Sequence, residues 1–250
     1  MGTQFPNGGL LLHYLISDIH GDLKSFKKML ELLDLNNDIL IMLGDVLDKG
    51  NKPMESLNLV RMLMRDYPGH VQLIKGNHEL FASMYLEGSL SERTYLTRDY
   101  GGKTTLEALR KMNTEEIEDF KGFIDSLPLY CEIDSPKYGT CIATHSGLHV
   151  DYITHNDDGS IDVVKSIEKG YEKDPFEYMC SGDIHRMPTN HLDHFMIVGH
   201  VPCVYLEGKS YKILRRKRYM CIDSGADPGC RKLGGRLSMY CVETDEEFYA

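Results

Sequence analysis

Six side chains of types that bind divalent metal ions stand directly after short apolar runs of the chain. Carboxylates, neutral imidazoles and an amide oxygen suit divalent first-row metals such as manganese, iron and zinc. Six ligands are more than one ion requires, so the set indicates a site for two divalent metal ions, in which an Asp can bridge both. The six residues are Asp18, His20, Asp45, Asn77, His145 and His200.

The first of these clusters is Asp18-Ile19-His20-Gly21-Asp22, which follows an apolar run at residues 10–16. Positions two apart in an extended segment point the same way, so Asp18 and His20 can hold one ion. Gly21 removes side-chain bulk where a substrate must come close. A helical apolar pattern begins at Leu23. The cluster therefore stands where a strand turns into a helix, which is where α/β sheets bind their ligands.

Strands and helices alternate through the first third of the chain. The next two clusters also stand where a predicted strand ends. Apolar runs predict strands at residues 10–16, 38–43 and 71–74, and periodic patterns predict helices at residues 23–34 and 53–67. This alternation predicts parallel strands joined by helices. The carboxyl ends of such strands meet at one edge, so the clusters after them would form one site.

The remainder of the chain predicts a second sheet. Helices are expected at residues 104–112 and 114–126, a hairpin at 130–133 and 140–144, and a buried strand at 195–198. Residues 151–192 are polar and poorly periodic, which suggests an insertion over the site with a helix near 161–169. The strand-rich segment from Tyr211 predicts a more antiparallel sheet. We expect one α/β domain over residues 1–250, with two stacked mixed sheets flanked by helices.

Composition narrows the class of protein. The chain has 250 residues and a formal net charge of −10, which argues against a nucleic-acid-binding surface. No apolar run approaches the roughly 18 to 20 residues that span a bilayer. The N-terminus lacks the pattern of a secretory signal. Seven cysteines without paired spacing indicate reduced thiols, so we expect a cytoplasmic protein with no membrane partner.

The ordered motifs resemble those of the calcineurin-like metallophosphoesterase superfamily and, within it, the phosphoprotein phosphatase family. The matching pieces are Asp-Ile-His-Gly-Asp, Gly-Asp-Val-Leu-Asp-Lys-Gly, Gly-Asn-His-Glu, His-Ser-Gly and Gly-His, from Asp18 to His200. The closing Ile222-Asp223-Ser224-Gly225-Ala226 and Gly234-Gly235-Arg236-Leu237 resemble its bacterial and phage branch. This resemblance implies a four-layer α/β/β/α sandwich of the metallophosphoesterase type.

The resemblance also implies a role for each metal ligand. Asp18 and His20 would hold the first metal ion, and Asp45 would bridge the pair. The ligands of the second ion would be Asn77, His145 and His200. Both ions would be divalent, Mn²⁺ first of all, with iron or zinc as alternatives. The nucleophile implied by the family is a hydroxide that bridges the two ions.

Catalysis and substrate binding would fall to four further side chains and to Asn77. His78 would be the general acid for the leaving alkoxide, and Asp48 would orient it. Lys49 and Arg186 would bind the substrate phosphate together with Asn77. The family usually has Arg where Lys49 stands, and an ammonium lacks the bidentate grip of a guanidinium. Lys49 and Arg186 also suit an alternative interpretation as solvated surface charges.

Three functions agree with this pattern. The preferred one is a metal-dependent hydrolase acting on phosphorylated serine or threonine side chains of a protein. The alternative within enzymes is a symmetrical bis(5'-nucleosyl)-tetraphosphatase, which hydrolyses diadenosine tetraphosphate, a small nucleotide phosphoester. The alternative of another class is a weakly active, metal-bearing binding module. The presence of both Asp48 and His78 argues against the module, because a scaffold needs neither.

Overall fold

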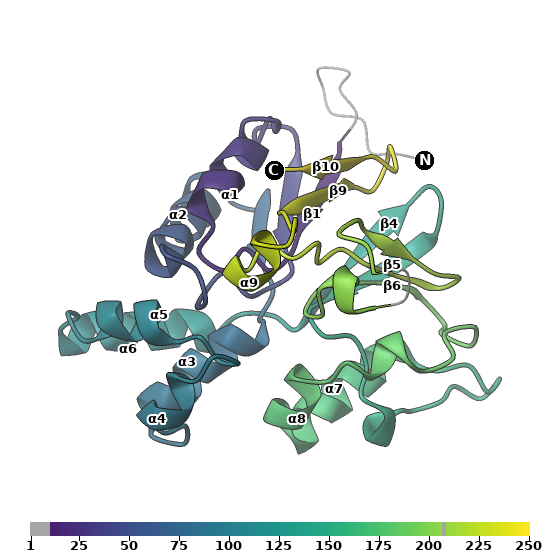
Figure 1. Ribbon diagram of the computed structural model, residues 1–250. Helices are drawn as coiled ribbons and strands as arrows, with labels where there is room; N and C mark the ends of the chain where they lie inside the picture. Colours follow the sequence, from purple (N-terminus) through teal and green to yellow (C-terminus); the bar gives the residue numbers. More distant parts are fainter. Residues whose placement is uncertain (1–10, 207–208) are drawn as a thin grey trace.

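The computed structural model describes residues 11–206 and 209–250 of the chain. Residue Leu10, with which the predicted first strand begins, lies outside the described residues. The described part is built on two five-stranded mixed sheets that pack face to face, with helices on both outer faces (Figure 1). The predicted α/β fold of two stacked sheets flanked by helices is confirmed.

The first sheet carries the three strands predicted from the alternating pattern. Its order is β10 (Glu247–Tyr249), β9 (Ser238–Cys241), β1 (His13–Ile16), β2 (Ile39–Met42) and β3 (Val71–Leu73). Strands β1, β2 and β3 are parallel, and His13 lies opposite Ile39. Helices α1 (Leu23–Leu30) and α2 (Pro53–Asp66) connect them. The parallel pairing predicted from the sequence is therefore present.

The second sheet contains the predicted hairpin and the predicted buried strand. Its order is β4 (Tyr130–Ser135), β5 (Gly139–Thr144), β6 (Phe195–Val198), β8 (Tyr219–Cys221) and β7 (Leu214–Arg215). Strands β5, β6 and β8 are parallel to one another. The expectation that the segment from Tyr211 forms a second, more antiparallel sheet is wrong. Its strands β9 and β10 join the first sheet, where β9 pairs with β1, and the second sheet has as many parallel as antiparallel pairings.

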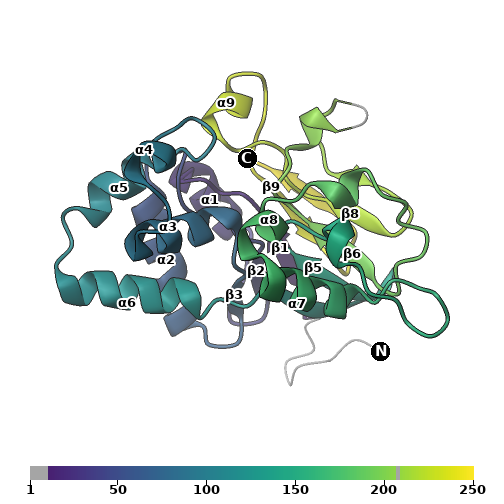
Figure 2. The ribbon, with the colours of Figure 1, turned by 90° about the horizontal axis from the view of Figure 1, so that it is seen from below.

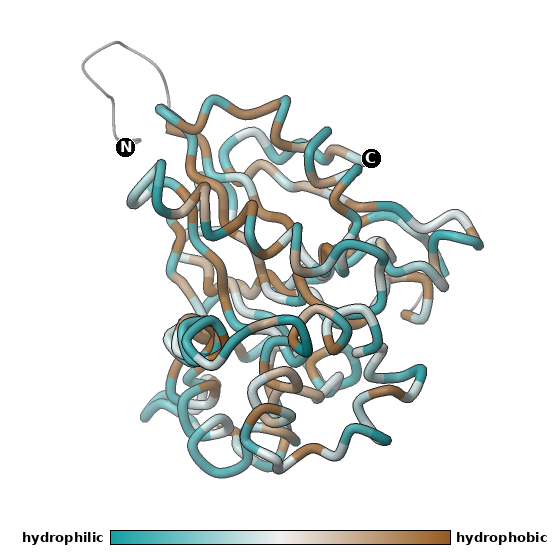
Figure 3. Tube along the Cα trace, turned by 90° about the vertical axis from the view of Figure 1, so that its left-hand side faces the viewer, coloured by the Kyte–Doolittle hydropathy of each residue, from teal (hydrophilic) through white to brown (hydrophobic). Residues whose placement is uncertain are grey.

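Three hydrophobic clusters hold the four layers together. Alternate residues of β1 and β2 point to opposite faces, as the pleat of a strand requires. Leu15 and Ile41 face the second sheet and pack near Ile197, whereas Ile16 and Met42 face the first helical layer. Hydrophobic stretches run through the middle of the molecule in Figure 3. The strand ends that carry the motifs are therefore fixed by packing on both faces.

A group of helices extends from one end of the first sheet (Figure 2). It consists of α3 (Asn77–Glu87), α4 (Glu92–Tyr95), α5 (Lys103–Leu109) and α6 (Thr114–Asp125). The last two correspond to the helices predicted at residues 104–112 and 114–126. Helix α3 starts directly at the Asn-His pair of the third motif, so that pair lies in its first turn.

Residues 151–192 lie over the outer face of the second sheet and are more regular than predicted. They include the helices α7 (Val163–Lys173) and α8 (Pro175–Met179) and a 3-10 turn η2 (Asp183–His185). Helix α7 begins two residues after the predicted start, because the Asp162 side chain accepts a hydrogen bond from the Lys165 amide and caps the helix. Ile161 forms a β-bridge instead.

Two further predictions concern the membrane and the thiols. Among the described helices, none combines the length and the apolar character needed to cross a bilayer. All seven cysteines are free thiols, and five of them are buried. The absence of disulfides in the fold agrees with the prediction of reduced cysteines.

Candidate active site

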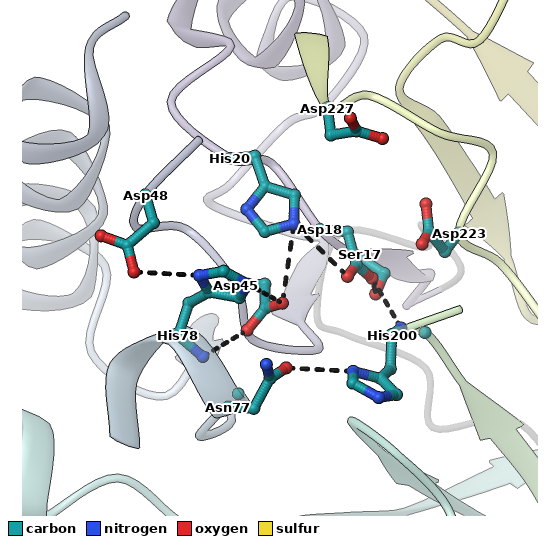
Figure 4. A network of polar contacts seen from close by, with 12 residues as sticks. Ser17, Asp18, His20, Asp45, Asp48, Asn77, His78, His200, Asp223 and Asp227 are labelled. Atoms are coloured by element: carbon teal, nitrogen blue, oxygen red, sulfur yellow. Dashed lines mark hydrogen bonds and ion pairs between the residues drawn. The ribbon is translucent and has the colours of Figure 1, made fainter. Parts of the chain in front are cut away.

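The six predicted metal ligands meet at one edge of the two sheets, and Figure 4 labels all of them except His145, which lies beside Asn77. Each follows the carboxyl end of a strand: β1, β2 and β3 in the first sheet, and β5 and β6 in the second. Five of the six are buried, and His200 is half-buried. The structure therefore brings together side chains that lie up to 182 positions apart in the chain, as in the bond from the His200 amide to Asp18.

The backbone at these positions is strained. The φ angles of Asp18, His20, Asp45 and His200 are 54°, 46°, 55° and 71°, in the left-handed region that non-glycine residues avoid. Such a conformation costs about 1–3 kcal/mol for each residue. Bonds between neighbouring loops hold it in place, and the His20 amide donates to the Asp45 carbonyl over 2.8 Å. Sharp turns at the strand ends thus direct these side chains toward one point.

The Asp45 carboxylate lies between two groups of imidazoles. Its Oδ2 is 3.6 Å from Nε2 of His20 and 3.8 Å from Nε2 of His78, whereas its Oδ1 is 3.4 Å from Nε2 of His145. A Cβ at Gly76 would collide with Oδ1, so glycine is required there for the carboxylate to fit. One carboxylate therefore contacts both halves of the cluster.

Asn77 joins the two histidines of the second sheet. Its Oδ1 lies 2.7 Å from Nε2 of His145 and 3.0 Å from Nδ1 of His200. His145 Nδ1 in turn lies 2.7 Å from the Leu43 carbonyl, and that bond fixes the ring with Nε2 facing the cluster. The carbonyl of Leu47 lies 3.0 Å from Nδ1 of His20 and orients that ring in the same way.

These residues fit divalent cations. The donors fall into two compact groups whose ligand atoms lie within 4.8 Å of one another, His20 with Asp45 and His78, and Asp45 with His145 and His200. Burial lowers the pKa of His20 and His200 well below the usual value, which leaves both imidazoles neutral, as metal binding requires. Burial also raises the pKa of Asp45 well above its usual value, since the ionised carboxylate is poorly solvated there. The carboxylate therefore needs a nearby positive charge to stay ionised.

The Asp18 carboxylate also indicates a cation site. Its Oδ2 accepts hydrogen bonds from the Ser17 hydroxyl and from the His200 amide, the latter over 2.9 Å. Among the described residues, its buried Oδ1 has no hydrogen-bond partner and lies 3.9 Å from Nε2 of His20. Buried carboxylate oxygens are rarely left unpaired, so this oxygen is available to bind a cation next to His20.

His78 and Asp48 form a buried pair beside this cluster. Nδ1 of His78 lies 2.9 Å from Oδ2 of Asp48, and the Tyr95 hydroxyl donates to the other oxygen, Oδ1, over 2.8 Å. Burial raises the pKa of Asp48 to about 7 and lowers the pKa of His78 well below its usual value. A charge on either group alone is disfavoured, so the two side chains are suited to share one proton. Sequence reasoning missed Tyr95, which gives no motif.

Glu79 supports the site, and the sequence analysis gave it no role. It is completely buried, and its carboxylate accepts hydrogen bonds from the amides of Asp45, Val46, Leu47 and Gly76 over 2.7 to 3.2 Å. These bonds hold the loop after β2 against the start of α3. Glu79 stands next to His78 in the third motif, and that adjacency was the available signal.

Asp223 is another carboxylate that the sequence analysis left without a role. It follows β8, is buried, and accepts a hydrogen bond from the Gly225 amide over 2.8 Å. Burial first, and then the nearby Asp18 carboxylate, raise its pKa well above the usual value. Like the predicted ligands, it ends a buried apolar strand, and this pattern could have identified it.

A cavity of about 240 Å³ opens over the cluster. Its walls include His78, Asn77, Lys49 and the aromatic rings of Phe81, Tyr100 and Phe176. The predicted phosphate-binding residue Lys49 thus borders the cavity. Arg186, the other predicted cation, is exposed at the end of η2 and is not part of the cavity wall.

Most of the chain matches a known protein family. The family model of calcineurin-like phosphoesterases matches residues 14–223 of the chain, which include the motifs from Asp18 to His200 and all six predicted ligands. The chain belongs to the calcineurin-like phosphoesterase family. The strand-end motifs that define this phosphoesterase therefore coincide with the clustered carboxylates and imidazoles.

Named relatives of this phosphoesterase fall into two groups. A symmetrical bis(5'-nucleosyl)-tetraphosphatase of Wigglesworthia glossinidia brevipalpis is 40% identical over 70 residues, which is 27% of this chain and 24% of that protein. A serine/threonine-protein phosphatase of Saccharomyces cerevisiae is 28% identical over 159 residues, 62% of this chain and 36% of that protein. The matches thus span about a quarter to a third of these two relatives.

Solved structures support the fold. A protein serine/threonine phosphatase from Saccharomyces cerevisiae superposes on this phosphoesterase with a TM-score of 0.61 at 17% sequence identity. The match covers 96% of this chain and 80% of the other. The similarity extends over both sheets, so the arrangement of the two sheets and their helices is common to the two proteins.

Proposed function

We propose that the chain hydrolyses phosphoesters at a centre of two divalent metal ions, and that its substrates are phosphorylated serine or threonine side chains. The observation that supports this most is the position of Asp45, whose two carboxylate oxygens face separate groups of imidazoles. A carboxylate shared in this way is suited to bridge two cations. Manganese is the metal we propose first, because oxygen and imidazole ligands both suit it.

The proposed ligands of the two ions overlap with the two compact groups, except that Asp18 takes the place of His78 in the first and Asn77 joins the second. Asp18 and His20 would hold the first ion, Asp45 would bridge, and the second would be held by Asn77, His145 and His200. Two divalent cations bound here supply Lewis acidity, which polarises a phosphoryl oxygen and makes water a nucleophile at neutral pH. The buried setting would strengthen the attraction between bound cations and a phosphate dianion, because little water screens it.

His78 is the proposed general acid. Its Nδ1 faces Asp48, so the proton that it gives to the leaving oxygen comes from Nε2, on the other side of the ring. Asp48 would favour the protonated ring and fix its orientation, and the Tyr95 hydroxyl would hold Asp48 in turn. A binding module without turnover has no need of this buried chain of hydrogen bonds, which favours an enzyme.

Lys49, Asn77 and Arg186 are proposed to contact the substrate phosphate. Lys49 and Asn77 border the cavity over the cluster, and the Lys49 ammonium supplies one positive charge there. Arg186 is exposed and outside the cavity wall, so it would have to reach a bound phosphate from the cavity's surroundings. We further propose a cytoplasmic setting, in which seven free thiols remain reduced.

Hydrolysis of a dinucleoside polyphosphate is the second candidate function. It is favoured by the similarity to symmetrical bis(5'-nucleosyl)-tetraphosphatases, which reaches 40% identity over a short segment. The metal ligands and the His78 pair would serve this reaction equally well, because both substrates are attacked at phosphorus. The distinction therefore depends on what binds around the cluster and not on the cluster itself.

The experiment that tests the proposal compares three substrates on one preparation with added Mn²⁺. p-Nitrophenyl phosphate reports phosphoester hydrolysis of any kind, a phosphoserine peptide reports protein phosphatase activity, and diadenosine tetraphosphate reports the second candidate. We expect turnover of the first two, abolished by a chelator and restored by Mn²⁺. Metal binding without turnover of any substrate would favour the binding module instead.

A further inference from the structure

A second and larger cavity borders the metal-ligand cluster at His20. Its volume is about 850 Å³, against about 240 Å³ for the cavity over His78. His20, Gly21 and Gly50 form one end of it, and the residues of the first two turns of α1 form one wall. The short helix α9 (Pro228–Arg231), which lies beside α1 in Figure 1, contributes to the other wall. Lys49, the chain neighbour of Gly50, borders the cavity over His78, so residues adjacent in the chain line the two cavities. A peptide whose phosphate lies over the cluster can therefore extend past this turn into the second cavity.

The walls of this second cavity are strongly basic. The chain as a whole carries 38 acidic and 28 basic residues, so a positive surface is unusual for it. We call this surface the basic groove and define it by its five cationic side chains, which are Lys24, Lys27, Lys28, Lys52 and Arg231. In the described part of the chain, Asp22 is the one carboxylate side chain in its wall.

The positive charge of the lysines is available to a ligand. Arg231 donates hydrogen bonds to Asp22, to the Ser25 hydroxyl and to the Ala250 carbonyl, so the one carboxylate side chain of the wall is already paired with the one guanidinium. The four lysines are exposed. Nothing in residues 11–206 and 209–250 places a carboxylate within ion-pair distance of them. A bound anion is the partner that would neutralise them.

We infer that the basic groove binds acidic side chains that flank the phosphorylated residue of a peptide substrate. The inference rests on the proposed phosphatase function and names its preferred substrate class. Lys24 and Lys28 are four residues apart on α1, which separates them by about 6 Å along the helix axis. In an extended peptide, side chains two residues apart point the same way and are separated by about 6.6 Å. The lysines therefore match carboxylates on alternate residues of a peptide.

The type of cation favours carboxylates of a flexible peptide over a polyphosphate. Phosphate groups held in a fixed position are bound best by planar guanidinium groups, which donate two hydrogen bonds at once. The groove's one guanidinium, that of Arg231, is occupied by Asp22. Lysines on long stems are point charges that adapt to carboxylates at varying positions. The groove thus suits variable acidic sequences around a common phosphoresidue.

The test measures kcat/KM for phosphoserine peptides that carry three glutamates on either side of the phosphoserine. Matched peptides have glutamine at the same positions, and p-nitrophenyl phosphate is the reference substrate. The groove variant combines Lys24→Gln, Lys27→Gln and Lys28→Gln. The control variant combines Lys111→Gln, Lys165→Gln and Lys173→Gln, which remove the same charge from exposed lysines outside the groove.

We expect the wild type to prefer a glutamate peptide by about tenfold, since each exposed ion pair contributes a small factor. The groove variant should lose this preference relative to p-nitrophenyl phosphate, and the control variant should keep it. Salt should weaken the preference of the wild type and leave the groove variant unaffected. Absence of the preference in the wild type, or an equal loss in both variants, would overturn the inference.

Two further outcomes separate this inference from the proposed function. If all proteins hydrolyse p-nitrophenyl phosphate but the groove variant raises KM only for diadenosine tetraphosphate, the groove binds polyphosphate and the peptide inference is wrong. If the wild type with Mn²⁺ hydrolyses none of the substrates, the proposed function fails and the inference fails with it.

Discussion

Nδ1 of His78 lies 2.9 Å from Oδ2 of Asp48, and both side chains are buried. This pairing leaves the other ring nitrogen, Nε2, directed toward the Asp45 carboxylate, 3.8 Å away. The ring thus connects the metal-ligand cluster to a buried carboxylate that has no place in either proposed metal site. We therefore propose that His78 transfers a proton and does not bind metal.

His78→Asn should lose far more rate on a phosphoserine peptide than on p-nitrophenyl phosphate. A seryl alkoxide leaves as a strong base and needs a proton, whereas a phenolate leaves readily without one. Positioned general acids contribute roughly 100- to 10,000-fold, and this factor should fall mainly on the poor leaving group. The measurement is the turnover number on both substrates, and Asp48→Asn should show the same pattern more mildly.

The control for the His78 variant is its metal content. Nε2 of His78 also belongs to a compact group with His20 and Asp45, so loss of metal together with activity would make His78 a ligand. Equal losses on both substrates at full metal content would remove it as the leaving-group acid.

Tyr95→Phe tests the third member of the buried chain. The variant removes the hydroxyl that donates to Oδ1 of Asp48 and leaves that buried oxygen without its donor. Such a loss costs about 1–3 kcal/mol of free energy of unfolding. Turnover of the phosphoserine peptide should fall less than in His78→Asn, since the His78–Asp48 contact itself remains. Unchanged stability and turnover would show that the hydroxyl does not support Asp48.

Glu79→Gln should destabilise the protein even without metal. The carboxylate accepts four backbone amides at the base of the site, and an amide group in its place turns a donor toward donors. We expect a loss of at least about 1–3 kcal/mol in urea unfolding with a chelator present. Glu87→Gln is the control, because Glu87 is exposed and its pair with Lys121 contributes little. A similar effect of both changes would refute the role of Glu79.

Lys49→Arg should preserve turnover and lower KM for a phosphoester. A guanidinium can bind two phosphate oxygens at once, whereas an ammonium acts as a point charge. Lys49→Ala should raise KM, because Lys49 borders the cavity and contributes a positive charge there. The measurement is kcat and KM on p-nitrophenyl phosphate. If Lys49→Ala leaves both constants unchanged, the alternative interpretation as a surface charge is correct.

The meeting of the six proposed metal ligands at one edge was predictable, because in the sequence each motif directly follows a predicted strand. Each motif directly follows an apolar run, so the ends of parallel strands had to bring Asp18, Asp45 and Asn77 to one edge. The residues that hold the site in place were harder to predict from the sequence. Glu79 adjoins a motif, but its four backbone bonds depend on how the loop after β2 folds. Tyr95 belongs to a four-residue helix whose position relative to Asp48 no local pattern specifies.

The sheet membership of the last strands was not predictable for a related reason. Residues Ser238–Cys241 of β9 are all buried, as a strand between two others must be, and the sequence shows this only as an apolar run. Which sheet receives such a strand depends on which edge is free once the other layers have packed. In this protein β2 pairs with one edge of β1, and β9 pairs with the other edge.

The number of metal ions bound by each chain tests the account most directly. After incubation with excess Mn²⁺ and removal of free metal, elemental analysis should find two ions per wild-type chain. Asp18→Asn should weaken chiefly one site, whereas Asp45→Asn should weaken both, because the two oxygens of Asp45 face both groups of ligands. A consistent single ion per wild-type chain at saturating metal would contradict the two-metal centre.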